Sequence, residues 1–168
     1  MEFIETNISG VWLVSWDNET LVSEQYEAIY PIYYGPSFQS KGIKAYNREY
    51  AYSLKKGMLY GFVNIEDDQL HGVITGESYH VVMDIREESK TYGKKLQVML
   101  SKKNQWMLCL PAGVAHGFLA TSEKSLCIIK CRALQKHKRI INWDDPKWGV
   151  YWPFKERNIK KPILWESE

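Results

Sequence analysis

Short apolar or alternating segments, separated by turn residues, constrain the fold of this chain more than any other feature. Turn residues such as Glu66–Asp68, Gly76 and Pro111–Gly113 lie between them. Each segment has the length of a β-strand, and little helical periodicity competes. The chain is therefore predicted to form an all-β jelly roll or sandwich. The predicted strands cover residues 10–15, 58–65, 70–75, 79–85, 96–100, 106–110, 117–120 and 126–131.

Two other segments are less regular. Residues 26–34 contain four tyrosines and Pro31, and periodicity alone does not separate strand from helix there. The tail from Trp143 is rich in Pro and Trp, and is predicted to pack on the barrel as irregular chain with short helical turns. A length of 168 residues fits one domain, 1–168, with one core.

Composition narrows the classes of partner. The net charge of +2 is too small to favour nucleic acid, and Lys55–Lys56 and Lys160–Lys161 are interpreted as solvated surface. No apolar run approaches about 18 residues, which excludes a membrane-spanning helix. The acidic, mixed start does not resemble a signal peptide. Three cysteines without C-x-x-C spacing, of which Cys127 and Cys131 are predicted to be buried thiols, favour a reducing cytoplasm over a zinc site.

Several motifs follow one another in the order of a known family. They are Gly76-Glu77 followed by Met83-Asp84-Ile85-Arg86, then Thr91-Tyr92-Gly93, Leu100-Ser101 with Asn104, the run LPAGVAHGF at 110–118, Lys130-Cys131, Trp143–Pro146 with Gly149 and Trp152-Pro153, and Pro162–Leu164. Each motif alone is weak, but together the order and spacing are specific. Over residues 58–164 the chain resembles the cupin-fold 4-keto-6-deoxyhexose 3,5-epimerases, the RmlC-like dTDP-4-dehydrorhamnose 3,5-epimerase family.

The resemblance implies a jelly-roll cupin that forms a homodimer through an extended N-terminal strand and acts on a nucleoside-diphosphate sugar. In that family a 4-keto group acidifies the hydrogens at C3 and C5. A histidine held by a carboxylate removes them, a lysine stabilises the enolate, and a tyrosine returns a proton. No metal or cofactor is implied, because the ketone itself accepts the electrons.

The chain departs from the family at its reactive positions. The family's R-G-L-H-Y-Q falls on 60–65, so Val63 stands where the base is expected and Tyr60 where an arginine contacts phosphate. Gln69 stands in place of the lysine. No tyrosine lies between Tyr92 and Tyr151, and the first arginine is Arg48. We therefore expect that the standard 3,5-epimerase reaction is not performed.

Other residues are candidates to replace the missing groups. Imidazole has an ordinary pKa of about 6.5, which suits a base near neutral pH. His116 lies in the intact LPAGVAHGF run, and His71 shares a strand face with Gln69. The predicted catalytic residues are His116, His71 and Asp84, the last as an orienting carboxylate. The predicted substrate-binding residues are Tyr60, Gln69, His80 and Lys130, and no metal ligand is predicted.

Alternative interpretations stay open. In one alternative the histidines are exposed or incidentally buried strand residues, and Asp84 is half of a buried ion pair with Lys130 or Arg86. The tyrosines between Tyr26 and Tyr60 either belong to the core, stack on a ligand, or supply the missing acid. Three functions compete: an epimerase or isomerase of a nucleotide-linked keto sugar, a non-catalytic sugar-nucleotide-binding or scaffold protein, and a metal cupin with unrelated chemistry.

Overall fold

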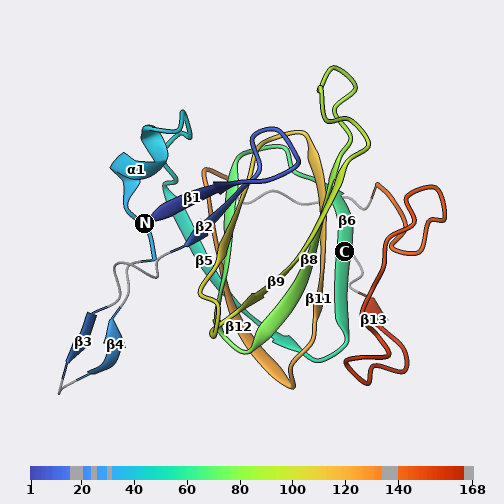
Figure 1. Cartoon of the computed structure of the whole chain (residues 1–168). Helices are drawn as coiled ribbons and strands as arrows, with labels where there is room; N and C mark the ends of the chain where they lie inside the picture. Colours follow the sequence, from blue (N-terminus) through green and yellow to red (C-terminus); the bar gives the residue numbers. More distant parts are fainter. Residues whose placement is uncertain (16–20, 24–25, 30–31, 134–139, 165–168) are drawn as a thin grey trace.

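Two antiparallel sheets pack face to face in the computed structural model of the chain, shown in Figure 1. Residues 1–15, 21–23, 26–29, 32–133 and 140–164 are described, those at 21–29 by their backbone only. In order across it, the large sheet contains β1 (Glu2–Glu5), β2 (Trp12–Ser15), β10 (Met107–Leu110), β7 (Gln69–Thr75), β12 (Lys124–Cys131) and β5 (Arg48–Lys55).

The small sheet contains β13 (Ile163–Leu164), β6 (Met58–Asn64), β11 (Val114–Ala120), β8 (Glu77–Asp84) and β9 (Lys95–Ser101), and only the β13–β6 pairing in this described sheet is parallel. A separate hairpin is formed by β3 (Leu21–Ser23) and β4 (Tyr26–Ile29), and α1 spans Gly35–Gln39. The arrangement confirms the predicted jelly-roll cupin fold.

Both sheets are covered on their outer faces as well as packed against each other. The segment around α1 covers the large sheet, where Phe38 is fully buried against Val14 and Leu70. The C-terminal tail covers the small sheet, where Trp152 packs in the same cluster as Leu59. Figure 1 shows these two covers on opposite sides of the barrel. Because both faces of the small sheet are covered, every residue of β11 is buried. A strand buried on both faces is mostly apolar in sequence.

The eight strands predicted from the sequence are all present within one to three residues, as β2 and β6–β12. Five further elements were not predicted from the sequence, namely β1, β3, β5, β13 and α1. Of these β5 matters most, because it forms the edge of the large sheet. In β5, Tyr50, Tyr52 and Leu54 alternate with more exposed neighbours, which is the period of a half-buried strand. Within the undecided segment Tyr26 begins β4, while Tyr30 and Pro31 lie outside the described residues.

The tail from residue 140 is irregular, as predicted, and the described part contains turns and the short β13 but no helix. Specific polar contacts fix it to the barrel. The indole nitrogen of Trp152 donates a 2.8 Å hydrogen bond to the carbonyl of Trp143. Arg157 forms an ion pair with Glu77 at the start of β8. These contacts hold the apolar side chains of the tail against the small sheet.

A close approach between β6 and β11 depends on Gly61. This residue has a φ of 105°, a region that favours glycine. A Cβ atom placed there would lie 2.7 Å from the Cα of Gly117 and 2.7 Å from the carbonyl oxygen of His116. The pairing of the two strands shifts register between His116 and Phe118. The glycine therefore lets β6 run against the backbone on which His116 sits.

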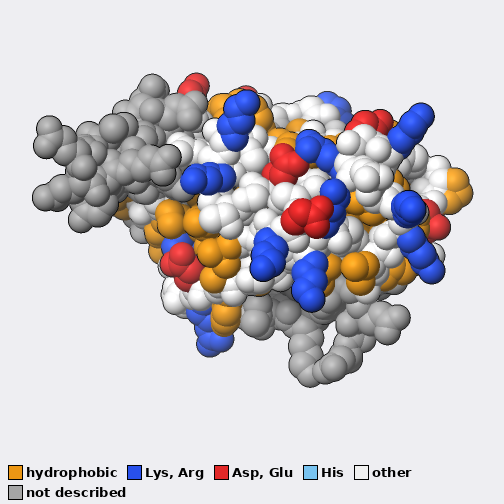
Figure 2. All heavy atoms as spheres, turned by 90° about the horizontal axis from the view of Figure 1, so that it is seen from below, with side chains coloured by type: hydrophobic (Ala, Val, Ile, Leu, Met, Phe, Trp, Pro, Cys, Tyr) orange, Lys and Arg blue, Asp and Glu red, His pale blue; other side chains and the backbone are white. Residues whose placement is uncertain are grey.

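The exposed surface carries no dominant charge on the face that Figure 2 shows. Basic side chains are interspersed with acidic and apolar ones, and no histidine side chain is seen there. No helix in the described part of the chain is long and apolar enough to cross a membrane. The predicted dimer through an N-terminal strand stays a prediction, since β1 pairs here with β2 of the same chain.

Candidate active site

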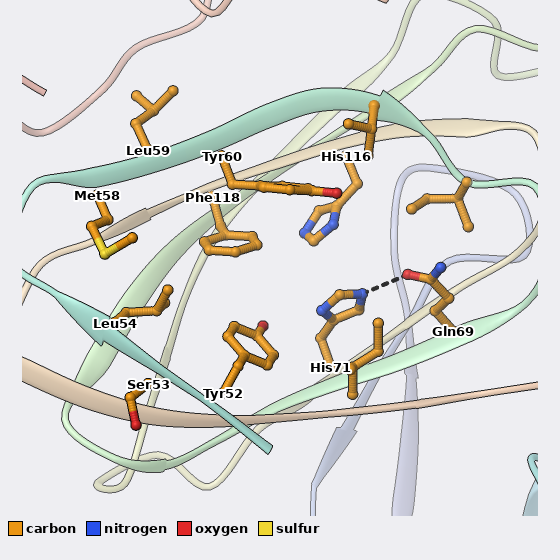
Figure 3. A pocket seen from close by; sticks show the side chains of 13 residues that line it. Tyr52, Ser53, Leu54, Met58, Leu59, Tyr60, Gln69, His71, His116 and Phe118 are labelled. Atoms are coloured by element: carbon orange, nitrogen blue, oxygen red, sulfur yellow. Dashed lines mark hydrogen bonds between the residues drawn. The ribbon is translucent and has the colours of Figure 1, made fainter. Parts of the chain in front are cut away.

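A cavity of about 300 Å³ lies between the two sheets near β5 and β6. Figure 3 shows its walls, which are mostly aromatic and aliphatic. Polar side chains gather at one end, where Gln69, His71 and His116 meet. The lining residues are Tyr52, Ser53, Leu54, Met58, Leu59, Tyr60, Val63, Ile65, Gln69, His71, His116, Phe118 and Ile129.

Three histidine rings form one buried cluster at the polar end of this pocket. His71, His80 and His116 are 4%, 1% and 0% exposed. The ring centroids of His71 and His116 are 4.6 Å apart, and those of His80 and His116 are 5.2 Å apart. Both His71 and His116 line the pocket, whereas His80 lies behind His116. Of the two positions that the sequence left open for His71 and His80, exposed or facing into the barrel, the structure has both rings in the interior.

Hydrogen bonds order the rings. The Nδ1 atom of His80 lies 3.0 Å from the Nε2 atom of His116, and its Nε2 atom lies 2.7 Å from the hydroxyl oxygen of Ser78. Burial and the neighbouring His71 hold the pKa of His80 well below its usual value. His80 is therefore neutral at pH 7. Neutral imidazole has one donor and one acceptor nitrogen, so His80 joins Ser78 to His116 as a relay.

On the other side of the cluster, His71 is oriented by Gln69. The Nε2 atom of His71 lies 2.9 Å from the amide oxygen of Gln69. An amide oxygen only accepts, so the ring nitrogen donates in this bond. The amide group of Gln69 keeps its N–H donors for other partners.

Strand register explains why these side chains face inward. His116 pairs with Val63 on β6 and with Val82 on β8, and the side chains of directly paired residues lie on the same face. His80 pairs with Phe118, two residues further along β11. The second wall comes from β7, where His71 and Gln69 alternate with the outward Leu70. Val63, the residue at the family's base position, therefore lies beside His116 on the neighbouring strand and on the same face of the sheet.

Aromatic side chains form the remaining walls. The ring of Tyr60 stacks on Phe118 with centroids 5.0 Å apart. Burial raises the pKa of Tyr60 well above its usual value, so its hydroxyl stays protonated. Tyr52 approaches from β5, with its centroid 6.0 Å from that of Phe118. In Figure 3 Tyr60 and His116 lie on one wall and Tyr52 and His71 on the other.

The structure does not bring Asp84 to the histidines. Asp84 is fully buried, but its oxygens accept hydrogen bonds from Arg86 (2.8 Å), Ser89 (2.6 Å) and Thr91 (2.6 Å). Desolvation opposes the charge, yet these hydrogen bonds outweigh it and hold the pKa of Asp84 below its usual value. Asp84 does share a strand face with His80, but four residues of strand separate them by about 13 Å. The ion pair with Arg86 is the alternative that the sequence left open.

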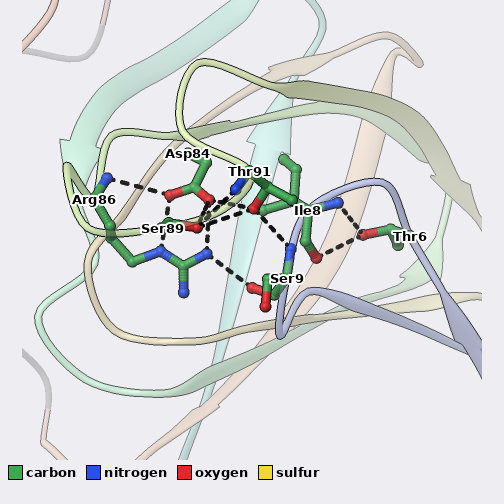
Figure 4. Close-up of polar contacts among 7 residues, drawn as sticks. All are labelled: Thr6, Ile8, Ser9, Asp84, Arg86, Ser89 and Thr91. Carbon is green, nitrogen blue, oxygen red and sulfur yellow. Dashed lines mark hydrogen bonds and ion pairs between the residues drawn. The ribbon is translucent and has the colours of Figure 1, made fainter.

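The carboxylate of Asp84 belongs instead to a structural network, shown in Figure 4. Arg86 also donates to the carbonyl of Ser9, 2.8 Å away, and the Ser9 amide donates to the hydroxyl of Thr91 at 3.0 Å. Ser9 lies in the turn between β1 and β2, and Thr91 in the connection from β8 to β9. The network therefore joins the two sheets at one end of the barrel.

Lys130 is also absent from the pocket. Its ammonium group forms an ion pair with Glu49 and lies 5.2 Å from the ring centroid of Tyr33. The reason is alternation on β12, where Lys130 pairs with Leu70 on the outer face and Ile129 pairs with His71 on the inner face. Of the predicted site residues, the structure thus gathers His116, His71, His80, Gln69 and Tyr60.

Three further residues complete the site, and of these only Tyr52 was offered from the sequence, as one of the tyrosines between Tyr26 and Tyr60. Tyr52 lines the pocket, Ser78 contacts His80, and Cys127 is the cross-strand partner of Tyr52. The alternation of Tyr50, Tyr52 and Leu54 was the signal for an inward Tyr52. The thiols of Cys127 and Cys131 are free and buried, as predicted.

A metal site finds no support in this arrangement. Among the described residues, no group of three or more His, Cys, Asp or Glu side chains is arranged to hold a metal ion. In the cluster the Nδ1 atom of His80 and the Nε2 atom of His116 are directed at each other. The side chains therefore contact one another instead of converging on one point.

The fold and the site together define a jelly-roll cupin with a buried histidine cluster facing a small pocket. A family model described as dTDP-4-dehydrorhamnose 3,5-epimerase matches residues 5–166. The chain belongs to this family.

Named relatives agree with the assignment. The chain is 42% identical over 83 residues to a dTDP-4-dehydrorhamnose 3,5-epimerase of Methanothermobacter thermautotrophicus, which covers 48% of this chain and 45% of that protein. It is 34% identical over 92 residues to the spore coat polysaccharide biosynthesis protein SpsL of Bacillus subtilis, covering 52% and 61%. The chain spans about half the length of the curated relatives it matches.

A solved structure shows the same fold at lower sequence identity. The dTDP-6-deoxy-D-glucose-3,5-epimerase of Legionella pneumophila, in complex with dTDP-4-keto-L-rhamnose, superposes with a TM-score of 0.87. The identity is 24%, and the match covers 99% of this chain and 88% of that one.

Proposed function

We propose that this protein binds a nucleoside-diphosphate 4-keto-6-deoxyhexose and moves a proton at a carbon next to the ketone. The observation that carries the proposal is the meeting of His116 and His71 at the polar end of a pocket between the sheets. Membership of the epimerase family supports the class of ligand. The work of such a protein belongs to carbohydrate or surface-polysaccharide biosynthesis, as the name of the Bacillus subtilis relative suggests.

The size of the pocket sets which part of the ligand enters. Small-molecule pockets have volumes of about 300–1,000 Å³, and this cavity lies at the lower end of that range. We place the sugar ring inside, against the stacked rings of Tyr60 and Phe118. None of the lining residues in the described chain is Lys or Arg. The diphosphate and nucleoside are therefore placed outside the cavity.

The chemistry follows from the acidity of carbon next to a ketone. His116 is the proposed base, because it lines the pocket and its Nε2 atom is held by His80. An N–H of Gln69 would donate a hydrogen bond to the enolate oxygen. A neutral amide stabilises that charge less than an ammonium group does. We therefore expect a slower reaction than that of an enzyme with lysine at this position.

The proposed reaction is not the standard 3,5-epimerisation. Val63 has no proton to exchange, and it lies beside His116 on the same wall of the pocket. We expect one carbon to be changed instead of two. The presence of Val63 and Gln69 in place of the family's base and lysine also supports a second candidate function, namely binding of the sugar nucleotide without turnover.

The test is incubation with dTDP-4-keto-6-deoxyglucose in D₂O, followed by NMR of the sugar. We expect deuterium at a single carbon, C3 or C5, at a rate below about one per second, the lower end of the range typical of enzymes. Incorporation at both carbons at ordinary rates would establish the standard reaction. Binding by calorimetry with no incorporation at either carbon would favour the non-catalytic candidate.

A further inference from the structure

We propose that a chain of buried side chains carries a proton between two pocket-lining residues, His116 and Tyr52. The chain runs from His116 through His80, Ser78 and Cys127 to Tyr52. It would let His116 remove a proton from one face of the sugar and Tyr52 return one to the other face. This inference rests on the proposed function and names the groups that perform it.

The first half of the chain is defined by short contacts. His116 Nε2 lies 3.0 Å from His80 Nδ1, and His80 Nε2 lies 2.7 Å from the hydroxyl oxygen of Ser78. Ser78 is 0% exposed. Bulk water therefore does not reach these links, and a proton moving between them stays inside the barrel.

The second half crosses from the small sheet to the large sheet. Cys127 on β12 lies near enough to Ser78 on β8 and to Tyr52 on β5 for their side chains to shift the pKa of its thiol. Strand register supports the second contact independently, because Cys127 pairs directly with Tyr52. The side chains of such a pair lie on one face, with Cβ atoms about 4.5–5.5 Å apart. Cys127 is 1% exposed and is not a lining residue of the pocket.

The protonation states suit a relay of neutral groups. Burial raises the pKa of the Cys127 thiol to about 11 and raises the pKa of Tyr52 well above its usual value. Both therefore carry their protons at pH 7 and are able to donate. His80 is neutral, for the reasons given above. Each member then has one hydrogen to pass and one lone pair to receive.

The two ends of the chain face the same space from opposite walls. Figure 3 shows His116 on the wall of Tyr60 and Tyr52 on the wall of His71. The ring of Phe118 lies close to both, with centroids 5.8 Å from His116 and 6.0 Å from Tyr52. A sugar ring held between the walls would present one face to the base and the other to the acid, which is the geometry that inversion requires.

The protons balance over one inversion. The substrate carbon gives its proton to His116 Nδ1, and the Nε2 proton of His116 passes to His80 Nδ1. The Nε2 proton of His80 passes to Ser78, and the hydroxyl proton of Ser78 passes to the thiol of Cys127.

The thiol proton of Cys127 then passes to the oxygen of Tyr52, and the hydroxyl proton of Tyr52 goes to the substrate carbon. One proton leaves the sugar and one returns, so no charge is left on the enzyme. The hydrogen bonds of the chain are now reversed, which is the starting state for the opposite direction of the same epimerisation.

The first experiment needs no substrate. The side-chain nitrogen resonances of His80 in ¹⁵N-labelled protein report which ring nitrogen carries the proton. We expect Cys127→Val to change this distribution, because it breaks the chain, and Cys127→Ser to restore it. Cys109→Val is the matched control, since Cys109 is also buried but contacts Tyr46. Unchanged His80 resonances in Cys127→Val would overturn the chain.

The second experiment uses dTDP-4-keto-6-deoxyglucose under single-turnover and steady-state conditions. In Cys127→Val the first inversion and the later turnovers should both slow by about tenfold or more with KM unchanged, because the broken chain leaves opposite charges on His116 and Tyr52. Cys127→Ser should recover the steady-state rate. A steady-state rate in Cys127→Val equal to that of Cys109→Val would overturn the relay while leaving the proposed function intact.

The two experiments separate the two proposals. If the wild-type protein does not turn over this sugar, the proposed function fails for that substrate. The resonances of His80 still decide whether the chain exists.

Discussion

Two buried polar regions of the barrel differ in how their polar side chains are held. Asp84 is charged, and Arg86, Ser89 and Thr91 compensate that charge fully at the end of β8. The histidine cluster in the middle of the barrel is ordered by hydrogen bonds from His80 to His116 and to Ser78, and one side of it faces a cavity. A charge that is saturated by its neighbours stabilises structure. Neutral groups beside a cavity remain able to exchange protons with a ligand, and we therefore assign the chemistry to the second region.

The largest expected effect on stability comes from Asp84→Asn. The substitution removes the charge opposite Arg86 and replaces an acceptor by a donor facing Ser89 and Thr91. Breaking a buried ion pair costs about 3–5 kcal/mol. We expect the free energy of unfolding, measured in urea, to fall by about 3 kcal/mol. The folded protein should still exchange deuterium into the sugar substrate. Loss of exchange without loss of stability would return Asp84 to the active site.

Acid should weaken the same network. The pKa of Asp84 in the folded protein lies below its value of about 3.9 in an unfolded chain. Its contribution to stability is therefore complete above about pH 4 and is lost as the pH falls through the folded pKa. Urea midpoints of wild-type and Asp84→Asn protein should converge below pH 4. A constant difference between them would contradict the depressed pKa.

A smaller dependence on pH is expected from His80. Because its folded pKa is depressed, the unfolded chain binds a proton below about pH 6.5 while the folded protein does not. Stability should then fall with decreasing pH, by up to about 1.4 kcal/mol per pH unit from this group. Urea unfolding between pH 5 and 7 should show a shallower slope in His80→Gln. Equal slopes would mean that His80 is protonated in the folded state.

The smallest effect is expected from Glu123→Gln, which repeats the change from carboxylate to amide at an exposed ion pair. Glu123 lies 3.1 Å from Lys56, and its side chain is 85% exposed. Exposed pairs contribute about 0–1 kcal/mol. The urea midpoint should barely move. A loss as large as that of Asp84→Asn would show that burial does not separate the two sites.

The sequence predicted the eight central strands because each has an apolar or alternating segment and a turn at its end. It missed β5 because Tyr50, Tyr52 and Leu54 stand among charged residues at a sheet edge. Alternation allowed His71 and His80 to face inward but did not separate this from an exposed position, and the structure has both in the interior. Alternation misplaced Asp84, because a shared face says nothing of distance along the strand. Contacts between distant strands, such as His80 with His116, depend on the register of β8 and β11 and are not readable from spacing.

The central claim is that the pocket histidines, and not the Asp84 network, act on the sugar. The most direct test is the exchange of deuterium into dTDP-4-keto-6-deoxyglucose, measured by NMR with wild-type, His116→Gln and Asp84→Asn protein of confirmed fold. We predict a loss of about 10²–10⁴-fold in His116→Gln, the usual contribution of a general base, and near wild-type exchange per folded molecule in Asp84→Asn. Exchange that survives in His116→Gln but is lost in folded Asp84→Asn would contradict the account.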